Sequence, residues 1–384
     1  MARYLWAAGL ARPADEMVAV AVVLLALSRV GSTVLSGAVI AAYTVPSILS
    51  GPLLGAWLDR TGRPVAALAA NQFALAAMAV AMVFAPAPWL VAAAFVAGIT
   101  LPMTSGGFTS LVPRLARDLD RATSQDALLF NAAAVAGPGL AGVLSTVASP
   151  AVAVAVVAVP ASAGGLCTVA LRVPPHPAGE HSSLRAAIGR GLRHLVTTPP
   201  LRGATVASVV GYGSVGMLAT ALPLHVAGLG VDGDQAGVVW AVFELGAICC
   251  ILVVRRWLPR WRPERVVFTT VALYGVTLAL WPLAPHFPVL LVLALVSGLA
   301  QGPVLTATIT ARQRYTPGPL LGQVSTTGAS LKIGAYAAGA AGGGALLTAW
   351  SPTSVILLVG AGQLVGASLG AATARPTRTV QVTP

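Results

Sequence analysis

Residues 55–64 read Gly-Ala-Trp-Leu-Asp-Arg-Thr-Gly-Arg-Pro, a short charged stretch between the long apolar runs 36–58 and 64–85. A run of about 20 apolar residues spans a bilayer as a helix, whereas a barrel strand needs only about 9–11. One carboxylate and two guanidinium groups therefore stand where two apolar segments meet water. The stretch predicts a tight, charged turn between two membrane-spanning helices.

The composition of the whole chain also indicates a membrane protein. Of its 384 residues, 57% are hydrophobic and 9% are charged, whereas a soluble domain carries about 25% charged residues. So few charges cannot cover a water-facing surface. Because hydrocarbon admits only helices or closed barrels, and the apolar runs have helical length, we expect an all-α integral membrane protein.

Twelve apolar segments are visible along the chain, most of them separated by short turns rich in proline and glycine. They run approximately over 5–27, 36–58, 64–85, 88–111, 125–148, 150–171, 203–226, 235–254, 264–284, 287–310, 321–347 and 352–373. An even number of spans places both termini on one side of the membrane.

The basic residues identify that side. Every arginine except Arg12 and Arg29 falls in the termini or in the even-numbered loops of this tracing. Because cytoplasmic loops carry an excess of Lys and Arg, we expect both termini in the cytoplasm. The net charge of +12 is thus a topology signal, and we expect a lipid bilayer rather than a nucleic acid as the partner.

One long connection, residues 172–202, separates the first six spans from the last six. Within it, 183–196 predicts an amphipathic helix, with Arg185, Arg190 and Arg193 on its polar side. We expect this helix to lie on the anionic inner leaflet, and a regulatory site is the alternative.

The two halves of the chain resemble each other at an offset of about 200 positions. Gly98 pairs with Gly298, the Ser-Pro pair at 149–150 with that at 351–352, and residues 57–60 with 257–260. These matches predict two pseudo-symmetric six-helix bundles. The expected bounds are 1–171 for the first bundle, 172–202 for a cytoplasmic linker, 203–374 for the second bundle and 375–384 for a cytoplasmic tail.

Five ionisable residues lie away from the predicted interfaces: Arg12, Asp15, Glu16, Glu244 and Lys332. A charge at bilayer depth costs at least about 2.5–3.5 kcal/mol, so such residues pair with each other or face a water-filled cavity. In one interpretation Arg12–Asp15 and Glu244–Lys332 are neutralising pairs. In the other, which we favour in the order Glu16, Asp15, Glu244, a carboxyl group exchanges protons as its partners alternate. Lys332 is then available to an anionic part of a substrate.

Several uncharged residues inside the spans are candidates for lining a substrate cavity. For each of them a hydrogen bond or a packing contact between helices is the alternative. They are Tyr43, Asn71, Gln72, Asn131, Trp240, Gln301 and Tyr336.

Other classes of site are missing from the sequence. We find no nucleotide-binding loop, no spaced Cys/His cluster and no nucleophile–base constellation. The prediction is therefore no enzyme, no metal, no cofactor and no direct use of ATP.

The charged turn resembles the loop signature of the major facilitator superfamily of transporters, Gly-x-Leu-Ala-Asp-Arg-x-Gly-Arg-Arg/Lys. Gly55, Asp59, Arg60, Gly62 and Arg63 match it, and it falls between spans two and three, as in that family. Pro64 replaces the last basic residue.

A second stretch, 137–142, resembles the antiporter signature of drug exporters within that family. Gly137, Pro138 and Gly142 match, while alanines replace two other glycines. Close helix packing is the alternative. The fourth span lacks the buried arginine that many proton-coupled exporters carry.

The resemblance implies two six-helix bundles that rock about a central cavity. It places Asp59 opposite the start of the eleventh span, near 320–323, with Arg60 and Arg63 as the surrounding charges. Gly55 and Gly62 would permit close packing and a tight turn. The alternative is that the basic residues of this motif only fix the orientation of the chain in the membrane, by the positive-inside rule.

The chain looks most similar to bacterial drug or natural-product exporters. The implied activity is proton-coupled efflux of a small amphipathic compound, with multidrug resistance as a consequence, by a monomer in the bacterial plasma membrane. The alternatives are a proton-coupled symporter that imports a small metabolite, anionic if Lys332 contacts it, and a lipid flippase or membrane sensor.

Overall fold

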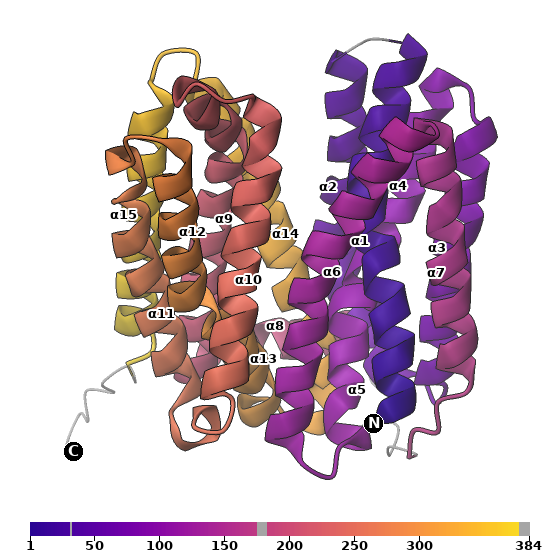
Figure 1. Cartoon of the computed structure of the whole chain (residues 1–384). Helices are drawn as coiled ribbons and strands as arrows, with labels where there is room; N and C mark the ends of the chain where they lie inside the picture. The colour runs from indigo at the N-terminus through magenta and orange to yellow at the C-terminus, as the bar shows by residue number, and fades with distance from the viewer. Residues whose placement is uncertain (31–32, 175–182, 376–384) are drawn as a thin grey trace.

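The computed structural model describes residues 1–30, 33–174 and 183–375, and among them every regular element is a helix (Figure 1). The first half holds α1 (Ala2–Val30), α2 (Thr33–Arg60), α3 (Pro64–Phe84), α4 (Ala87–Pro102), the π-helix η1 (Met103–Gly107), α5 (Phe108–Leu115), α6 (Leu119–Val147) and α7 (Pro150–Val169). The second half holds α9 (Pro199–Gly228), α10 (Ala236–Val254), α11 (Pro263–Leu278), α12 (Phe287–Gln301), α13 (Pro303–Tyr315), α14 (Leu321–Leu346) and α15 (Pro352–Thr373).

The predicted twelve-span fold is confirmed. Within the described ranges, ten helical segments are long and apolar enough to cross a membrane, with α4, η1 and α5 forming one of them and α12 with α13 another. The two remaining spans, α1 and α14, are 29 and 26 residues long. The first carries Arg12, Asp15, Glu16 and Arg29, and the second is rich in glycine and hydroxyl residues.

The helix starts and crossings show the internal repeat. Ser149 and Ser351 cap α7 and α15 in the same way, each hydroxyl accepting a backbone N–H three residues on, with proline at the first helical position. A Cβ on Gly98 would lie 2.7 Å from the Tyr43 carbonyl carbon, and one on Gly298 would lie 2.8 Å from that of Phe243. Both glycines therefore admit the same backbone crossing in the two halves.

Each half packs around its own apolar core, the first containing Met17 and Leu75 and the second Leu218 and Trp281. The halves lie side by side, and the start of α1 and the end of α15 lie at the same end of the molecule (Figure 1). We call that end the terminal face and the other end the opposite face. The charged turn after α2 also belongs to the terminal face.

The helix expected in the long connection is α8 (Leu184–Thr197), at the terminal face. It buries Ala187, Gly191 and Leu195 against the protein, where it packs on α2, α9 and α14. Arg185 and Arg193 stay exposed. The helix thus has a protein-bound face that the expectation of a helix resting on lipid did not include. Residues 376–384 of the expected tail lie outside the described residues.

Candidate transport site

Asp59, the last acidic residue of α2, joins the two halves. Its carboxylate accepts hydrogen bonds from the backbone N–H groups of Gly322 (2.7 Å) and Gln323 (2.8 Å) in the first turn of α14. These N–H groups have no partner inside the helix, and an anion is favoured there. The position that the resemblance assigned to Asp59, near 320–323, is confirmed.

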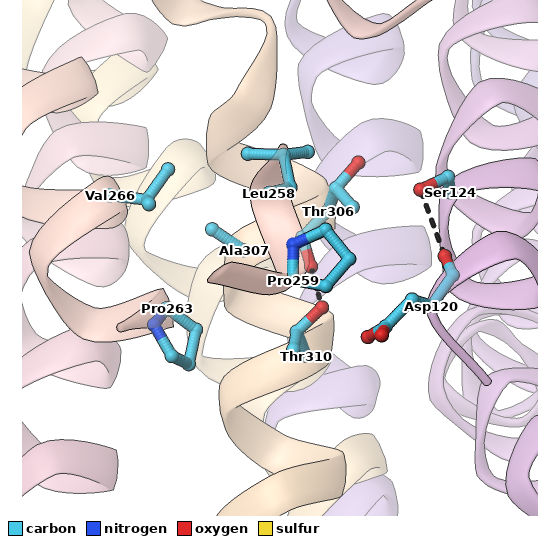
Figure 2. A pocket seen from close by; sticks show the side chains of 9 residues that line it. All are labelled: Asp120, Ser124, Leu258, Pro259, Pro263, Val266, Thr306, Ala307 and Thr310. Carbon is cyan, nitrogen blue, oxygen red and sulfur yellow. Dashed lines mark hydrogen bonds between the residues drawn. The ribbon is translucent and has the colours of Figure 1, made fainter. Parts of the chain in front are cut away.

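The contact between Asp59 and a helix start has no counterpart at the matching position of the second half. The start of α14 has no side-chain cap from its own segment, so Asp59 supplies the cap from the other half. The start of α6 is capped locally by Asp118, which accepts from the Arg121 N–H. Pro259 stands where the repeat has Asp59, and it faces Asp120 and Ser124 across a pocket between the halves (Figure 2). Only one of the two repeat positions therefore binds a helix start in the other half.

Glycines bring α2 and η1 against the backbone of α14. A Cβ on Gly55 would lie 2.6 Å from the Gln323 Cα, and one on Gly106 would lie 2.6 Å from the Thr326 Cα. The Thr326 hydroxyl donates to the Gly51 carbonyl at 2.7 Å. By contrast, nothing lies within 4 Å of a Cβ placed on Gly62. Gly55 is thus required for the closed terminal face, whereas Gly62 is not.

The charge partner of Asp59 differs from the one expected. Arg114 of α5 interacts electrostatically with Asp59, whereas Arg60 and the exposed Arg63 form no ion pair with any described residue. Arg114 lies at the end of the fourth span, which ends at this face beside the turn. The arginine that acts on Asp59 therefore comes from a helix that the predicted network of Arg60 and Arg63 did not include, although Arg114 too forms no ion pair with a described residue.

The linker helix α8 braces the same face. The Gln323 side-chain amide donates to the Ile188 carbonyl at 2.7 Å, and the His194 ring binds the Tyr315 carbonyl at 2.8 Å. α8 therefore holds both the start of α14 and the end of α13.

Arg12 pairs with Asp126, not with Asp15 as one of the two interpretations proposed. Its Nη2 lies 2.6 Å from the Asp126 Oδ1, with the two side chains 1% and 0% exposed. Tyr4 and Thr109 also donate to this carboxylate, and the guanidinium lies over the Phe130 ring at 3.7 Å. The pair is fully buried between α1 and α6, so it neutralises both charges inside the first half.

Sequence reasoning missed Asp126 because the fifth span was drawn from 125, which left this residue at the membrane boundary. The helix begins earlier, at Leu119, and Asp126 lies two turns inside it. Arg312 was missed for the same reason, since the tenth span was drawn only to 310 and α13 continues to Tyr315. Hydropathy ends a span at its first charge, although a charge that is buried in protein does not mark an interface.

Glu16, Glu244 and Lys332 form the charged centre of the molecule. Glu16 belongs to α1, and it interacts electrostatically with Lys332 of α14 and Glu244 of α10 in the other half. Lys332 lies over the Tyr212 ring at 3.9 Å, and the Tyr212 and Tyr336 rings are 6.2 Å apart. The Glu244–Lys332 ion pair of the first interpretation is not formed. Glu16, Glu244 and Lys332 are half-buried, with no ion pair or hydrogen bond to the rest of the described chain.

Within the antiporter-like stretch, Gly137 is the residue that lies against Glu16. A Cβ on Gly137 would lie 2.5 Å from the Glu16 Cβ, whereas Gly142 has nothing within 4 Å. Pro138 follows Gly137 inside α6, which continues past it. Gly137 thus lets α6 approach α1 at the turn that carries Glu16.

The other candidate residues divide into packing and pocket positions. The Tyr43 hydroxyl donates to the Asp15 carboxylate at 3.2 Å, and Asn71 and Gln72 both donate to Thr104. Trp240 packs edge-on against Phe243 in the second core, and Asn131 is buried in α6. Gln301 lines a pocket together with Lys332. No group of three His, Cys, Asp or Glu residues suited to a metal ion occurs in the described ranges.

Sequence comparison agrees with this architecture. The family model of the Major Facilitator Superfamily matches residues 5–211 and 204–384. The chain belongs to the major facilitator superfamily. It is 28% identical over 369 residues to y4rN of Sinorhizobium fredii, an uncharacterized MFS-type transporter, with 93% of this chain and 90% of that protein covered.

A solved structure shares the fold. The crystal structure of the human organic anion transporter MFSD10 (TETRAN) matches with a TM-score of 0.77 and 16% identity, and the match covers 96% of this chain and 99% of that one. Superfamily members are transporters, so this chain is a multi-pass membrane transporter.

Proposed function

We propose that this transporter exports a small amphipathic compound, a drug or natural product, in exchange for protons. The proposal is supported by Glu16, whose carboxyl group is half-buried between the halves and has no fixed partner in the described structure. Of its charged neighbours, Arg12 and Asp15 lie on its own helix, whereas Lys332 and Glu244 belong to the other half. When the halves rock, Lys332 and Glu244 change position relative to Glu16, and a carboxyl group whose charged neighbours change also changes its proton occupancy.

Orientation follows from the arginines. They concentrate at the terminal face, which the positive-inside rule assigns to the cytoplasm. The structure is then closed on the cytoplasmic side through Asp59, α2 and α14. In the proposed cycle, Glu16 takes up a proton from the outside while the terminal face is closed and releases it inside when that face opens.

Inverted membrane vesicles with an acidified lumen test the proposal. We expect an amphipathic antibiotic that is a substrate to relieve the quenching of an acridine dye, because protons leave the lumen as the compound enters. Vesicles without the protein are the control. If no compound in a broad panel relieves quenching, although the protein is folded and binds some of them, proton exchange is refuted.

A symporter that imports a small anionic metabolite is the second candidate, favoured by Lys332, which forms no ion pair with a described residue. The same vesicles separate the two functions. A symporter releases protons only with a compound loaded inside the lumen, whereas an exporter responds to a compound added outside.

A further inference from the structure

The second half contains a buried cation that no carboxylate balances. Arg312 of α13 is 6% exposed, and its one hydrogen bond to a described residue is a long one, 3.4 Å from Nη1 to the Ser325 carbonyl. Its Nε and Nη2 atoms have no hydrogen-bond partner in the described structure. A buried guanidinium without a partner is unfavourable, so such a group indicates a missing anion.

An unpartnered hydroxyl group lies beside the same position. Ser325 of α14, whose carbonyl accepts the long hydrogen bond from Arg312, is buried, and its hydroxyl oxygen has no partner among the described residues. The Arg312 guanidinium packs on Gly328, one turn along α14: a Cβ there would lie 2.5 Å from its Cζ. A guanidinium and a hydroxyl group, both without full partners, therefore lie together between α13 and α14.

Lys332 is a second cation near this position, on the side toward the centre of the molecule. Gly328 and Lys332 are four residues apart on α14, so they share one face of the helix. Thr308 and Arg312 have the same spacing on α13. A nearby pocket is lined by Lys332, Thr308 and the amide side chains of Gln301 and Gln363, together with Tyr212 of α9. Lys332 therefore reaches the pocket directly, and Arg312 lies one turn of α13 beyond Thr308 of its lining.

We propose that Arg312 and Lys332 bind an anionic group, a carboxylate or similar oxyanion, of the transported compound, with its aromatic or apolar part against Tyr212. The guanidinium supplies directed donors, the ammonium group supplies a second charge, and the Ser325 hydroxyl group supplies a further donor. The substrate would then be an amphipathic organic anion. This inference rests on the proposed function for the transport step but not for the binding step.

Binding to purified protein in detergent tests the site without any proton gradient. The probes are 1-naphthoate and the uncharged 1-naphthamide, which share the same ring and differ in the charged group. We expect tighter binding of naphthoate to the unmodified protein, measured by tryptophan quenching or calorimetry. We also expect Arg312→Gln to weaken naphthoate binding by at least about tenfold and to leave naphthamide binding unchanged.

The matched control is Arg314→Gln, which removes an exposed arginine two residues along α13 and should change neither affinity. If Arg312→Gln does not fold, Arg312→Lys and Lys332→Gln decide the question, because each should weaken naphthoate selectively. The site is ruled out if the unmodified protein binds naphthoate no more tightly than naphthamide, or if the folded variants bind naphthoate as the unmodified protein does. Failure of proton-driven transport would leave this result unchanged.

Discussion

We expect Asp126→Asn to destabilise the folded protein by roughly 3–5 kcal/mol, because it leaves a buried charge without its partner. Arg12 is 1% exposed and has no other carboxylate within ion-pair distance in the described structure. The variant should show a lower midpoint of thermal unfolding, followed by tryptophan fluorescence, and a smaller monodisperse fraction on gel filtration.

Two further variants show whether the cause is the unpaired charge. Asp234→Asn removes an exposed carboxylate and should unfold at the temperature of the unmodified protein. The double variant Arg12→Leu with Asp126→Leu removes both charges and should recover much of the lost stability. If Asp126→Asn unfolds at the temperature of the unmodified protein, the pair does not stabilise the first bundle.

We expect Glu16→Gln to reduce proton-driven transport to the level of vesicles without the protein. Glutamine resembles the protonated carboxyl group but cannot release a proton, so the variant cannot couple the gradient to movement of the compound. Exchange of labelled for unlabelled compound across the same vesicles should persist, because exchange requires no net proton movement.

The variant Asp15→Asn, at the neighbouring position in sequence, shows whether the loss of coupling is specific to Glu16. Asp15 is held by the Tyr43 hydroxyl, and Asp15→Asn preserves that hydrogen bond, so its coupling should be less affected. Asp234→Asn again serves as the control. Gradient-driven transport by Glu16→Gln at the rate of the unmodified protein would assign coupling to another acid, of which Glu244 is next.

The spans were predictable from local chemistry, because apolar length determines a spanning helix in lipid. The contact at the terminal face was predictable only through the resemblance of the motif to that of the superfamily. That resemblance gave the partner of Asp59, the first turn of α14, and the preference of a helix start for an anion agrees with it.

The partners of the buried charges were not predictable in the same way. A spacing of three residues put Arg12 beside Asp15 on one helix, but the tertiary fold brings Asp126 from α6 closer. Arg312 and Asp126 both lay beyond the spans drawn from hydropathy, because a protein interior accepts a charge that lipid would not. An ionisable residue within two turns of a predicted span end is therefore worth treating as buried.

Alternating access requires that α2 and η1 separate from α14 at the terminal face when the opposite face closes, so that one end is closed at a time. Pulsed electron paramagnetic resonance between spin labels tests it, with Cys167, Cys249 and Cys250 first replaced. One pair of labels, Arg63→Cys with Arg314→Cys, reports the terminal face. The other, Ala148→Cys with Asp232→Cys, reports the opposite face, and all four positions are exposed.

Gly55→Ala is the decisive perturbation, because its added Cβ would meet the backbone of α14, whereas Gly62→Ala adds a methyl group in open space. The account predicts that Gly55→Ala lengthens the terminal-face distance and shortens the opposite-face distance, and that Gly62→Ala changes neither. Distances that stay the same in Gly55→Ala, or that move in the same direction at both ends, would contradict it.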